Sequence, residues 1–186
     1  ILYMNYKLPT FLFIVYLIVI ILQREKFIWY YPSLPLYPDN KKDSKLTVYY
    51  TQKRNDRDIE FFKLTDPSVS YAFIQIVPEN VDTLNTLFQP ISKYVLILKY
   101  IFNRARPHQV NKNIKLLESN TANTPSYPSG HAAQAFYLAK QLEKKYPHLR
   151  NQLYECAEKC AKARVDAGLH YKSDNDFSKY IVFNFF

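Results

Sequence analysis

The hydrophobic positions of this chain form one long run near its start and several shorter segments further on. From Leu8 to Leu22 nearly every residue is apolar or aromatic. The later segments space their apolar residues as helices do, with no sustained alternation. We expect helices from Tyr94 to Arg104, from His131 to Ala139 and from Asn151 to Leu169. The pattern therefore predicts an all-α helical domain.

The run from Leu8 to Leu22 is predicted to anchor the chain in a membrane. A bilayer span needs about 20 apolar residues, with roughly 17 as the short limit. The run reaches that length if Ile1 to Tyr6 or Phe27 to Tyr31 contribute, and Trp29 begins an aromatic group typical of the membrane interface. A cleaved signal peptide and a buried core helix are the alternatives. The small-residue cleavage pattern is absent, which favours an uncleaved anchor over residues 1–26.

Residues 27–60 are expected to link this anchor to the domain. The stretch from Tyr31 to Arg57 carries three prolines and then many charged residues. Such a composition is typical of a linker. One short strand is expected from Leu46 to Thr51. The helical domain is then predicted to cover residues 61–186.

Lys99 stands in the most apolar of the later segments. Its neighbours from Val95 to Phe102 are apolar almost all round, which indicates a buried helix. A buried lysine needs a charged partner or a ligand. A seven-residue step returns to the same helical face, so a helix would bring Arg106 to the side of Lys99 before Pro107 ends it. The alternative is a solvated basic face.

The string Pro128-Ser129-Gly130-His131 joins a turn-rich loop to a segment of strong helix formers. Free backbone N–H groups and the helix dipole make such a helix start a site for anions. The alternative reading is an ordinary helix cap by Ser129. A neutral His131 beside a bound phosphate can share a proton with a leaving oxygen.

A third polar group follows the last predicted helix. Arg164 offers a planar fork to phosphate oxygens. His170 and Asp174 have the spacing that lets a carboxylate orient an imidazole, although such pairs are often structural. The chain has only 2 glycines, Gly130 and Gly168, and both lie among these residues. We expect each to need a backbone freedom that other residues lack, with Gly168 closing the helix.

The three strings together resemble the signature of the type 2 phosphatidic-acid phosphatase and vanadium haloperoxidase superfamily. That signature reads Lys-x6-Arg-Pro, Pro-Ser-Gly-His and Ser-Arg-x5-His-x3-Asp. The chain departs from it at one position, where Ala163 replaces the usual Ser. The segment from Asp66 to Phe73, followed by Val77-Pro78, adds a weak likeness to the lipid-phosphate branch; its plain reading is a turn entering a short apolar segment.

The resemblance implies a role for each matched residue. His170 would be the nucleophile that takes the phosphoryl group, Asp174 would orient it, and His131 would protonate the leaving alcohol. The implied phosphate-binding residues are Lys99, Arg106, Ser129, Gly130 and Arg164. Because cationic side chains can neutralise the phosphoryl oxygens, no metal or other cofactor is expected.

Composition and charge limit the kinds of molecule that the chain is expected to bind. The net charge of +9 is scattered along the chain, with no basic stripe or stacking platform for nucleic acid. It suits attraction to anionic lipid headgroups. Basic residues are richer after the apolar run than before it, which places the domain on the cytosolic side of the membrane. Cys156 and Cys160 are expected to be small core residues without a disulfide.

The sequence thus predicts a metal-independent phosphatase with a bundle of the phosphatidic-acid phosphatase type. Its substrate would be a phosphomonoester, with lipid phosphates such as phosphatidic acid among the candidates, and the reaction would pass through a phosphohistidine. The alternatives are a vanadate-dependent haloperoxidase and a catalytically silent, membrane-tethered binding protein.

Overall fold

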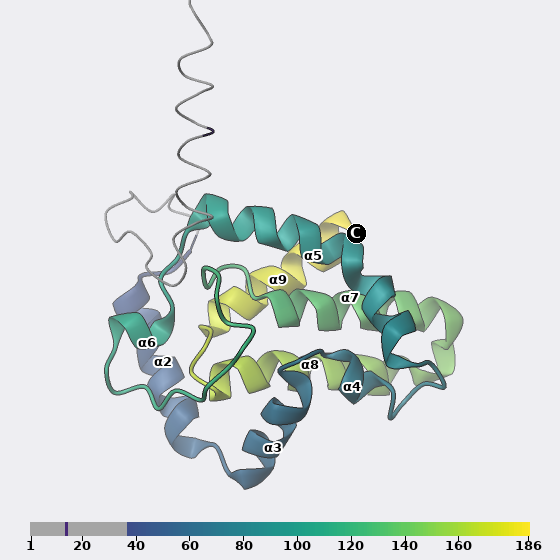
Figure 1. Ribbon diagram of the computed structural model, residues 1–186, viewed down its shortest axis with the longest axis horizontal. Helices are drawn as coiled ribbons and strands as arrows, with labels where there is room; N and C mark the ends of the chain where they lie inside the picture. Colours follow the sequence, from purple (N-terminus) through teal and green to yellow (C-terminus); the bar gives the residue numbers. More distant parts are fainter. Residues whose placement is uncertain (1–13, 15–36) are drawn as a thin grey trace, which may run out of the picture.

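The computed structural model describes residue 14 and residues 37–186 (Figure 1). Within this part the secondary structure is helical and includes no β-strand, so the all-α prediction is confirmed for it. The helices in chain order are α2 (Asn40–Lys53), α3 (Asp56–Thr65), α4 (Ser70–Phe73), α5 (Val81–Phe102), α6 (Pro107–Val110), α7 (Gly130–Lys145), the 3-10 helix η1 (Pro147–Leu149), α8 (Arg150–Asp166) and α9 (Lys172–Phe185).

Helix α7 lies at the centre of the bundle and packs against α5, α8 and α9. Its inner positions are mostly alanines, and these small side chains let the neighbouring helices come close; Ala132, Ala133, Ala135 and Ala139 are all fully buried. Leu138, Leu153 and Phe136 fill the space between them. Since α8 follows α7 after the short η1, the two helices run antiparallel (Figure 1).

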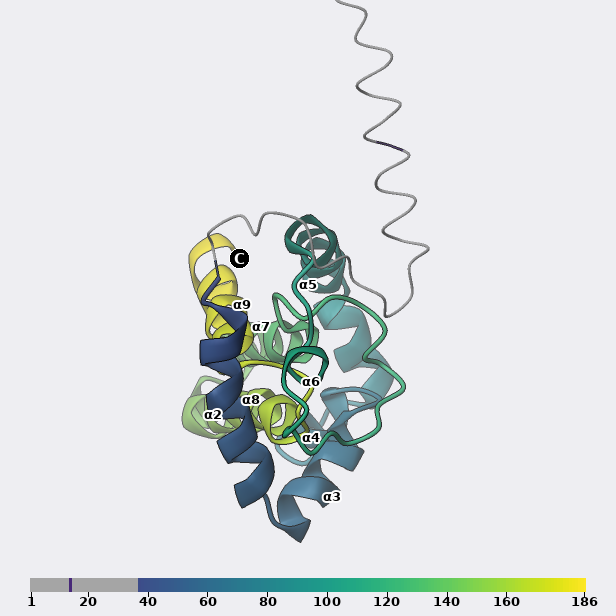
Figure 2. The ribbon, with the colours of Figure 1, turned by 90° about the vertical axis from the view of Figure 1, so that its left-hand side faces the viewer.

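This topology gathers several helix ends on one side of the bundle. The start of α7 and the end of α8 lie together because the two helices are antiparallel, and the end of α5 and the start of α9 meet them there (Figures 1 and 2). Lys99, Ser129, Arg164 and His170 stand at or next to these four ends. The fold thus brings the three strings to one place.

Helix α5 is longer than expected at its start and ends earlier than expected. It stops at Phe102, and Asn103 takes a left-handed conformation with φ 44°, which asparagine tolerates better than most residues. Arg106 is extended, as its place before Pro107 favours. The prediction that Lys99 and Arg106 share one helical face is therefore wrong; a turn, and not helical periodicity, places Arg106.

The strand expected from Leu46 to Thr51 is wrong, because these residues lie in α2. Asp39 caps this helix by accepting a hydrogen bond from the backbone N–H of Lys42 at 2.8 Å. The expected linker is therefore helical from Asn40 onward, and α2 packs on α6, α8 and α9. The side that it buries is small and polar, with Ser44, Thr47 and Thr51. No apolar stripe marked it as a packed helix.

The two glycines, Gly130 and Gly168, differ in backbone conformation and in the space around them. Gly168 has φ +79°, and a Cβ there would lie 2.7 Å from Cγ2 of Ile114, so the prediction of special backbone freedom is confirmed at this position. Gly130 lies inside the first turn of α7 without a positive φ. A Cβ there would meet Cε of Lys99 at an ordinary 3.8 Å, so the same prediction is wrong for Gly130.

The predicted anchor from Leu8 to Leu22 lies outside the described residues except for Ile14. Among the helices that the structure describes, none combines the length and the apolar character needed to cross a bilayer. Cys156 and Cys160 are buried free thiols, as predicted.

Candidate active site

His170 and Asp174 form a buried pair in the loop between α8 and α9 and the first turn of α9. Nδ1 of His170 lies 3.0 Å from Oδ2 of Asp174. The same carboxylate oxygen accepts a hydrogen bond from the backbone N–H of Tyr171 at 2.9 Å. Because Nδ1 faces the carboxylate, the proton sits on Nδ1 and the lone pair on Nε2, where a nucleophile needs it.

Two side chains that sequence reasoning missed hold Asp174 in place. NH1 of Arg104 donates to Oδ1 at 2.6 Å, and the hydroxyl of Ser126 donates to Oδ2. The guanidinium of Arg104 also lies 3.7 Å from the ring centre of Tyr171. Burial raises the pKa of Asp174, but Arg104 and Ser126 act against this and favour the carboxylate. Arg104 lies between Lys99 and Arg106 in the first string, which was the available signal.

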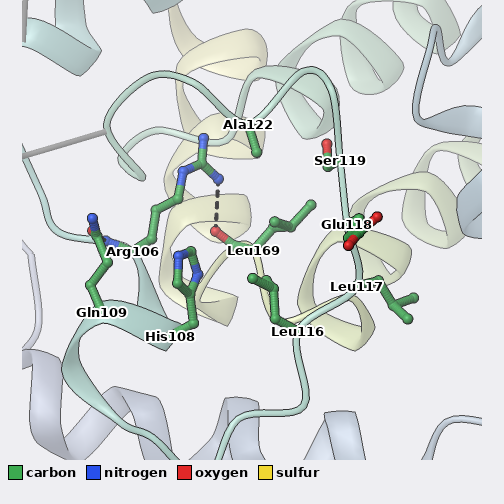
Figure 3. Close-up of a pocket in the computed structure, with 9 residues that line it drawn as sticks. All are labelled: Arg106, His108, Gln109, Leu116, Leu117, Glu118, Ser119, Ala122 and Leu169. Carbon is green, nitrogen blue, oxygen red and sulfur yellow. Dashed lines mark hydrogen bonds between the residues drawn. The ribbon is translucent and has the colours of Figure 1, made fainter. Parts of the chain in front are cut away.

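Arg106 lies beside Nε2 of the buried His170 ring. Its NH1 is 3.5 Å from Nε2 of His170. The same NH1 donates to the backbone oxygen of Leu169 at 2.9 Å (Figure 3). Its Nε donates to the backbone oxygen of Thr124 at 3.0 Å. The guanidinium is therefore beside the nitrogen that would carry a phosphoryl group. A cavity of about 270 Å³ lies beyond it, lined in part by Leu116, Ser119 and Leu169 (Figure 3).

Lys99 reaches the start of α7 from the last turn of α5. It is only 5 % exposed, and its ammonium donates to the backbone oxygen of Pro125 at 2.6 Å. No carboxylate among the described residues pairs with it. Burial first, and the positive charge of Arg106 second, hold the pKa of Lys99 well below its usual range. An anion next to it would reverse this penalty.

Ser129 occupies the cap position of α7. Its hydroxyl accepts from the backbone N–H of Ala132 at 3.4 Å, as the capping interpretation predicts. The backbone N–H of Ser129 donates to the backbone oxygen of Asp174 at 3.2 Å, which ties the helix start to the His170 loop. Gly130 follows, and its lack of a side chain leaves space beside Lys99.

Asp66 joins His131 and Arg164, and sequence reasoning did not assign it to the site. Nε2 of His131 lies 2.9 Å from the backbone oxygen of Asp66. NH1 of Arg164 donates to its carboxylate at 2.7 Å, and the hydroxyls of Ser119 and Thr121 donate to the same oxygen. Asp66 was noticed only as the start of the likeness to the lipid-phosphate branch, because nothing in a single sequence links it to an arginine so distant along the chain.

One donor of Arg164 is unused within the part of the chain that the structure describes. Its Nε is buried and has no hydrogen-bond partner among the described residues. A buried donor without a partner costs roughly 1–3 kcal/mol. Phosphate oxygens are the acceptors that an arginine fork fits best. The vacant donor therefore fits an anion bound next to Arg164.

The positive side chains act on both histidines. Burial and then the charge of Arg106, followed by that of Lys99, hold the pKa of His170 well below its usual range. Burial and Arg164 together lower the pKa of His131 to about 3. Both rings are therefore neutral at pH 7 in the ligand-free protein. Bound phosphate would offset the surrounding positive charge and raise both pKa values.

A cavity of about 390 Å³ opens at His131. Lys99 and Gly130 line the same end of it. Its remaining walls come from α5, α7 and the loops around Ser68 and Thr124. It is the opening through which an ester could reach the phosphate-binding side chains, and its volume lies in the range of small-molecule sites.

The structure thus brings all eight predicted site residues to one end of the bundle. The arrangement combines a neutral imidazole oriented by a carboxylate, three cationic side chains, a helix start and a second imidazole at a cavity. Among residues 37–186, no three His, Cys, Asp or Glu side chains gather as ligands of a metal ion would. The roles of the individual residues remain predictions.

Comparison with known proteins identifies the family. A search of curated proteins finds no match. A family model described as the PAP2 superfamily matches residues 83–181, which is more than half of the chain and includes every predicted site residue. This result confirms the resemblance drawn from the three strings, and the chain belongs to the PAP2 superfamily.

Proposed function

We propose that the chain is a metal-independent phosphatase that hydrolyses phosphomonoesters through a phosphohistidine. Family membership suggests phosphatase activity in general. The observation that carries the specific proposal is the buried Nε of Arg164, which has no hydrogen-bond partner among the described residues, in a cluster where Lys99 also lacks a carboxylate partner among them. Positive charge concentrated in this way stabilises the equatorial oxygens of a phosphoryl group in transfer.

In the first step, Nε2 of His170 attacks the phosphorus atom. An N–P bond forms as the bond to the alcohol oxygen breaks. Asp174 stabilises the positive charge that develops on the imidazole, and His131 gives its proton to the departing alkoxide. Lys99, Arg106 and Arg164 bind the phosphoryl oxygens, with Ser129 and the backbone N–H of Gly130 at the start of α7.

In the second step, water attacks the phosphohistidine. His131, now neutral, takes a proton from this water as its oxygen bonds to phosphorus. The N–P bond breaks, its electrons return to Nε2, and inorganic phosphate leaves. The ring of His131 is thereby protonated again, and the cycle closes without an oxidant, a reductant or a cofactor.

The test is to trap the intermediate. Wild-type protein mixed with a ³²P-labelled phosphomonoester and quenched in base should carry label that is stable to alkali and released by acid. His170→Ala should carry none and should show no turnover. His148→Ala is the matched control, since His148 is exposed and lies in η1. Label on the His170→Ala protein, or turnover near the wild-type rate, would overturn the proposal.

We further propose that Leu8 to Leu22 anchors the chain with its domain on the cytosolic side, and that lipid phosphates are among the substrates. The support is the apolar run and the basic residues after it. The full-length protein should then resist extraction by alkaline carbonate and need detergent. Release by carbonate would count against an anchor.

A further inference from the structure

The cavity at His131 extends away from the phosphate-binding side chains, and polar side chains line this extension. One stripe of α5 forms its length, because Asn85, Gln89, Ser92, Leu96 and Lys99 all line it and recur at the spacing of a single helical face. At 1.5 Å per residue the stripe from Lys99 to Asn85 is about 20 Å long. Four of these five positions are polar. A group leaving the phosphate at His131 would enter this groove.

Gln134 stands on the opposite wall, less than one turn of α7 beyond His131. Its Nε2 donates to the hydroxyl of Ser92 at 3.0 Å, and that hydroxyl donates to the backbone oxygen of Phe88 at 3.2 Å. Oε1 of Gln134 has no partner among the described residues. Gln134 therefore presents a fixed hydrogen-bond acceptor to the groove, close to the proposed proton donor.

Asn85 presents a hydrogen-bond donor at the end of the groove that is distant from His131. Its Oδ1 accepts from the hydroxyls of Ser68 at 2.6 Å and Ser70 at 2.9 Å. These two bonds fix the amide and leave its Nδ2, which has no partner in the described part of the chain, as a donor. The groove thus offers a fixed acceptor near His131 and a fixed donor further along.

Paired donors and acceptors suit hydroxyl groups, because each hydroxyl both donates and accepts a hydrogen bond. An acyl chain in the same place would remove both amides from water without replacing their hydrogen bonds, which is costly. Phe88 and Val95 form a buried apolar floor, and Pro67 and Leu96 add apolar surface to the walls beside the polar groups. A polyhydroxylated carbon chain fits this combination better than an alkyl chain.

We propose that the leaving alcohol is polyhydroxylated next to the phosphate ester, as in a polyol or sugar phosphate, and that Gln134 selects for it. This inference rests on the proposed phosphatase function. The same chemistry occurs in soluble polyol phosphates and in lipids whose headgroup is a phosphorylated polyol. In both cases the hydroxyls nearest the phosphate meet Gln134 and Ser92.

The experiment compares matched pairs of phosphomonoesters on the full chain. Sorbitol 6-phosphate and n-hexyl phosphate have the same number of carbons and differ in their hydroxyls. The value of kcat/KM should be at least tenfold higher for sorbitol 6-phosphate. In vesicles, phosphatidylinositol 4-phosphate is compared with phosphatidic acid in the same way. A preference in the soluble pair identifies a free polyol phosphate as the source, and one confined to the vesicle pair identifies a headgroup. No preference in either pair overturns the inference.

Gln134→Met removes the acceptor at nearly constant side-chain size. It should lower the ratio of the two kcat/KM values in the preferred pair about tenfold, the effect of one lost hydrogen bond. Gln141→Met on the same helix is the control, because the side chain of Gln141 contacts Lys144 away from the groove. Its ratio should equal that of the wild type. A ratio that does not respond to Gln134→Met would exclude Gln134 as the selecting residue.

Binding separates this inference from the phosphatase proposal. Calorimetry on His170→Ala measures the affinity of the groove for sorbitol 6-phosphate and n-hexyl phosphate without turnover. Tighter binding of the hydroxylated ligand supports the inference even if the wild type hydrolyses neither compound. Equal affinities, or tighter binding of n-hexyl phosphate, would overturn it even if the wild type proves to be an active phosphatase.

Discussion

The guanidinium of Arg104 lies 2.6 Å from Oδ1 of Asp174, and neither side chain is exposed to solvent at all. Arg104 also donates to Asp43 of α2 at 2.9 Å and to Asn40 at 2.9 Å. One buried arginine thus connects the carboxylate that orients His170 to a helix from the start of the domain. This connection makes Arg104 a positioning residue that acts on His170 through Asp174.

Arg104→Lys should lower kcat about tenfold or more while leaving KM for a soluble phosphomonoester nearly unchanged. A lysine keeps the charge but cannot reach Asp174, Asp43 and Asn40 at once, so the carboxylate loses its fixed orientation. Steady-state kinetics and the rate of phosphoenzyme formation measure the effect.

Arg54→Lys is the control for a purely structural arginine. Arg54 donates to the backbone oxygens of Lys115 and Asp166, away from His170. This variant should lose stability but keep kcat. If Arg104→Lys changes only the melting temperature, as Arg54→Lys is expected to do, Arg104 has no positioning role.

His131→Ala should slow turnover in proportion to how much the leaving alcohol needs a proton. General acid catalysis contributes roughly 10²–10⁴-fold, so hydrolysis of an alkyl phosphate should fall by that factor. Hydrolysis of p-nitrophenyl phosphate, whose leaving group is already a weak base, should fall much less. Equal losses on both substrates would argue that His131 binds phosphate and donates no proton.

The pH dependence of kcat/KM tests the same residue in the wild type. Burial and Arg164 lower the pKa of His131 to about 3 in the free protein, so only a small fraction is protonated at pH 7. As pH falls from 7 to 5 that fraction rises, and kcat/KM for an alkyl phosphate should rise relative to that for p-nitrophenyl phosphate. Dividing the kcat/KM of the alkyl phosphate by that of p-nitrophenyl phosphate cancels the effect of phosphate ionisation, which both substrates undergo. A flat or falling ratio would contradict the assignment.

Vanadate should inhibit competitively, and a chelator should leave activity unchanged. Vanadate resembles the phosphoryl group in transfer and would be bound by the same cations. Inhibition constants with and without EDTA measure both points. Loss of activity in EDTA that magnesium or zinc restores would contradict the metal-independent mechanism, and bromide oxidation with vanadate and peroxide would favour the haloperoxidase alternative.

The sequence predicted the local parts of the site better than its distant contacts. His170 and Asp174 are four residues apart, and Ser129 caps the helix that follows it directly in the sequence. Rules about neighbouring residues were therefore sufficient to predict these two features. Arg104 and Asp66 were missed because their partners are distant: Arg104 meets Asp174, and Asp66 meets Arg164, only after the bundle forms. The place of Arg104 inside the first string marked it as a candidate, but a single sequence does not indicate which distant residues such side chains will contact.

The helical class followed from periodicity, but α2 did not. Its buried positions are Ser44, Thr47 and Thr51, which no hydrophobic pattern reveals. Tertiary contacts override the weak local signal there, above all those of Asp43 with Arg104 and Ser173. The end of α5 was predicted too late along the chain. The left-handed conformation of Asn103 ends the helix at Phe102, before Pro107 would require it to end.

The stability of the fold should fall as pH drops below about 6.5. Burial and then Arg106 hold the pKa of His170 well below its usual range in the folded protein, whereas the unfolded chain binds the proton near pH 6.5. Between these two pKa values unfolding takes up a proton, so the free energy of unfolding rises with pH, by about 1.4 kcal/mol per pH unit for one histidine.

Urea unfolding between pH 7 and pH 5 measures the slope. His170→Asn should flatten it by about that amount. If the slopes of the wild type and His170→Asn coincide, His170 takes up its proton in the folded state as readily as in the unfolded chain, and the lowered pKa described for it is wrong.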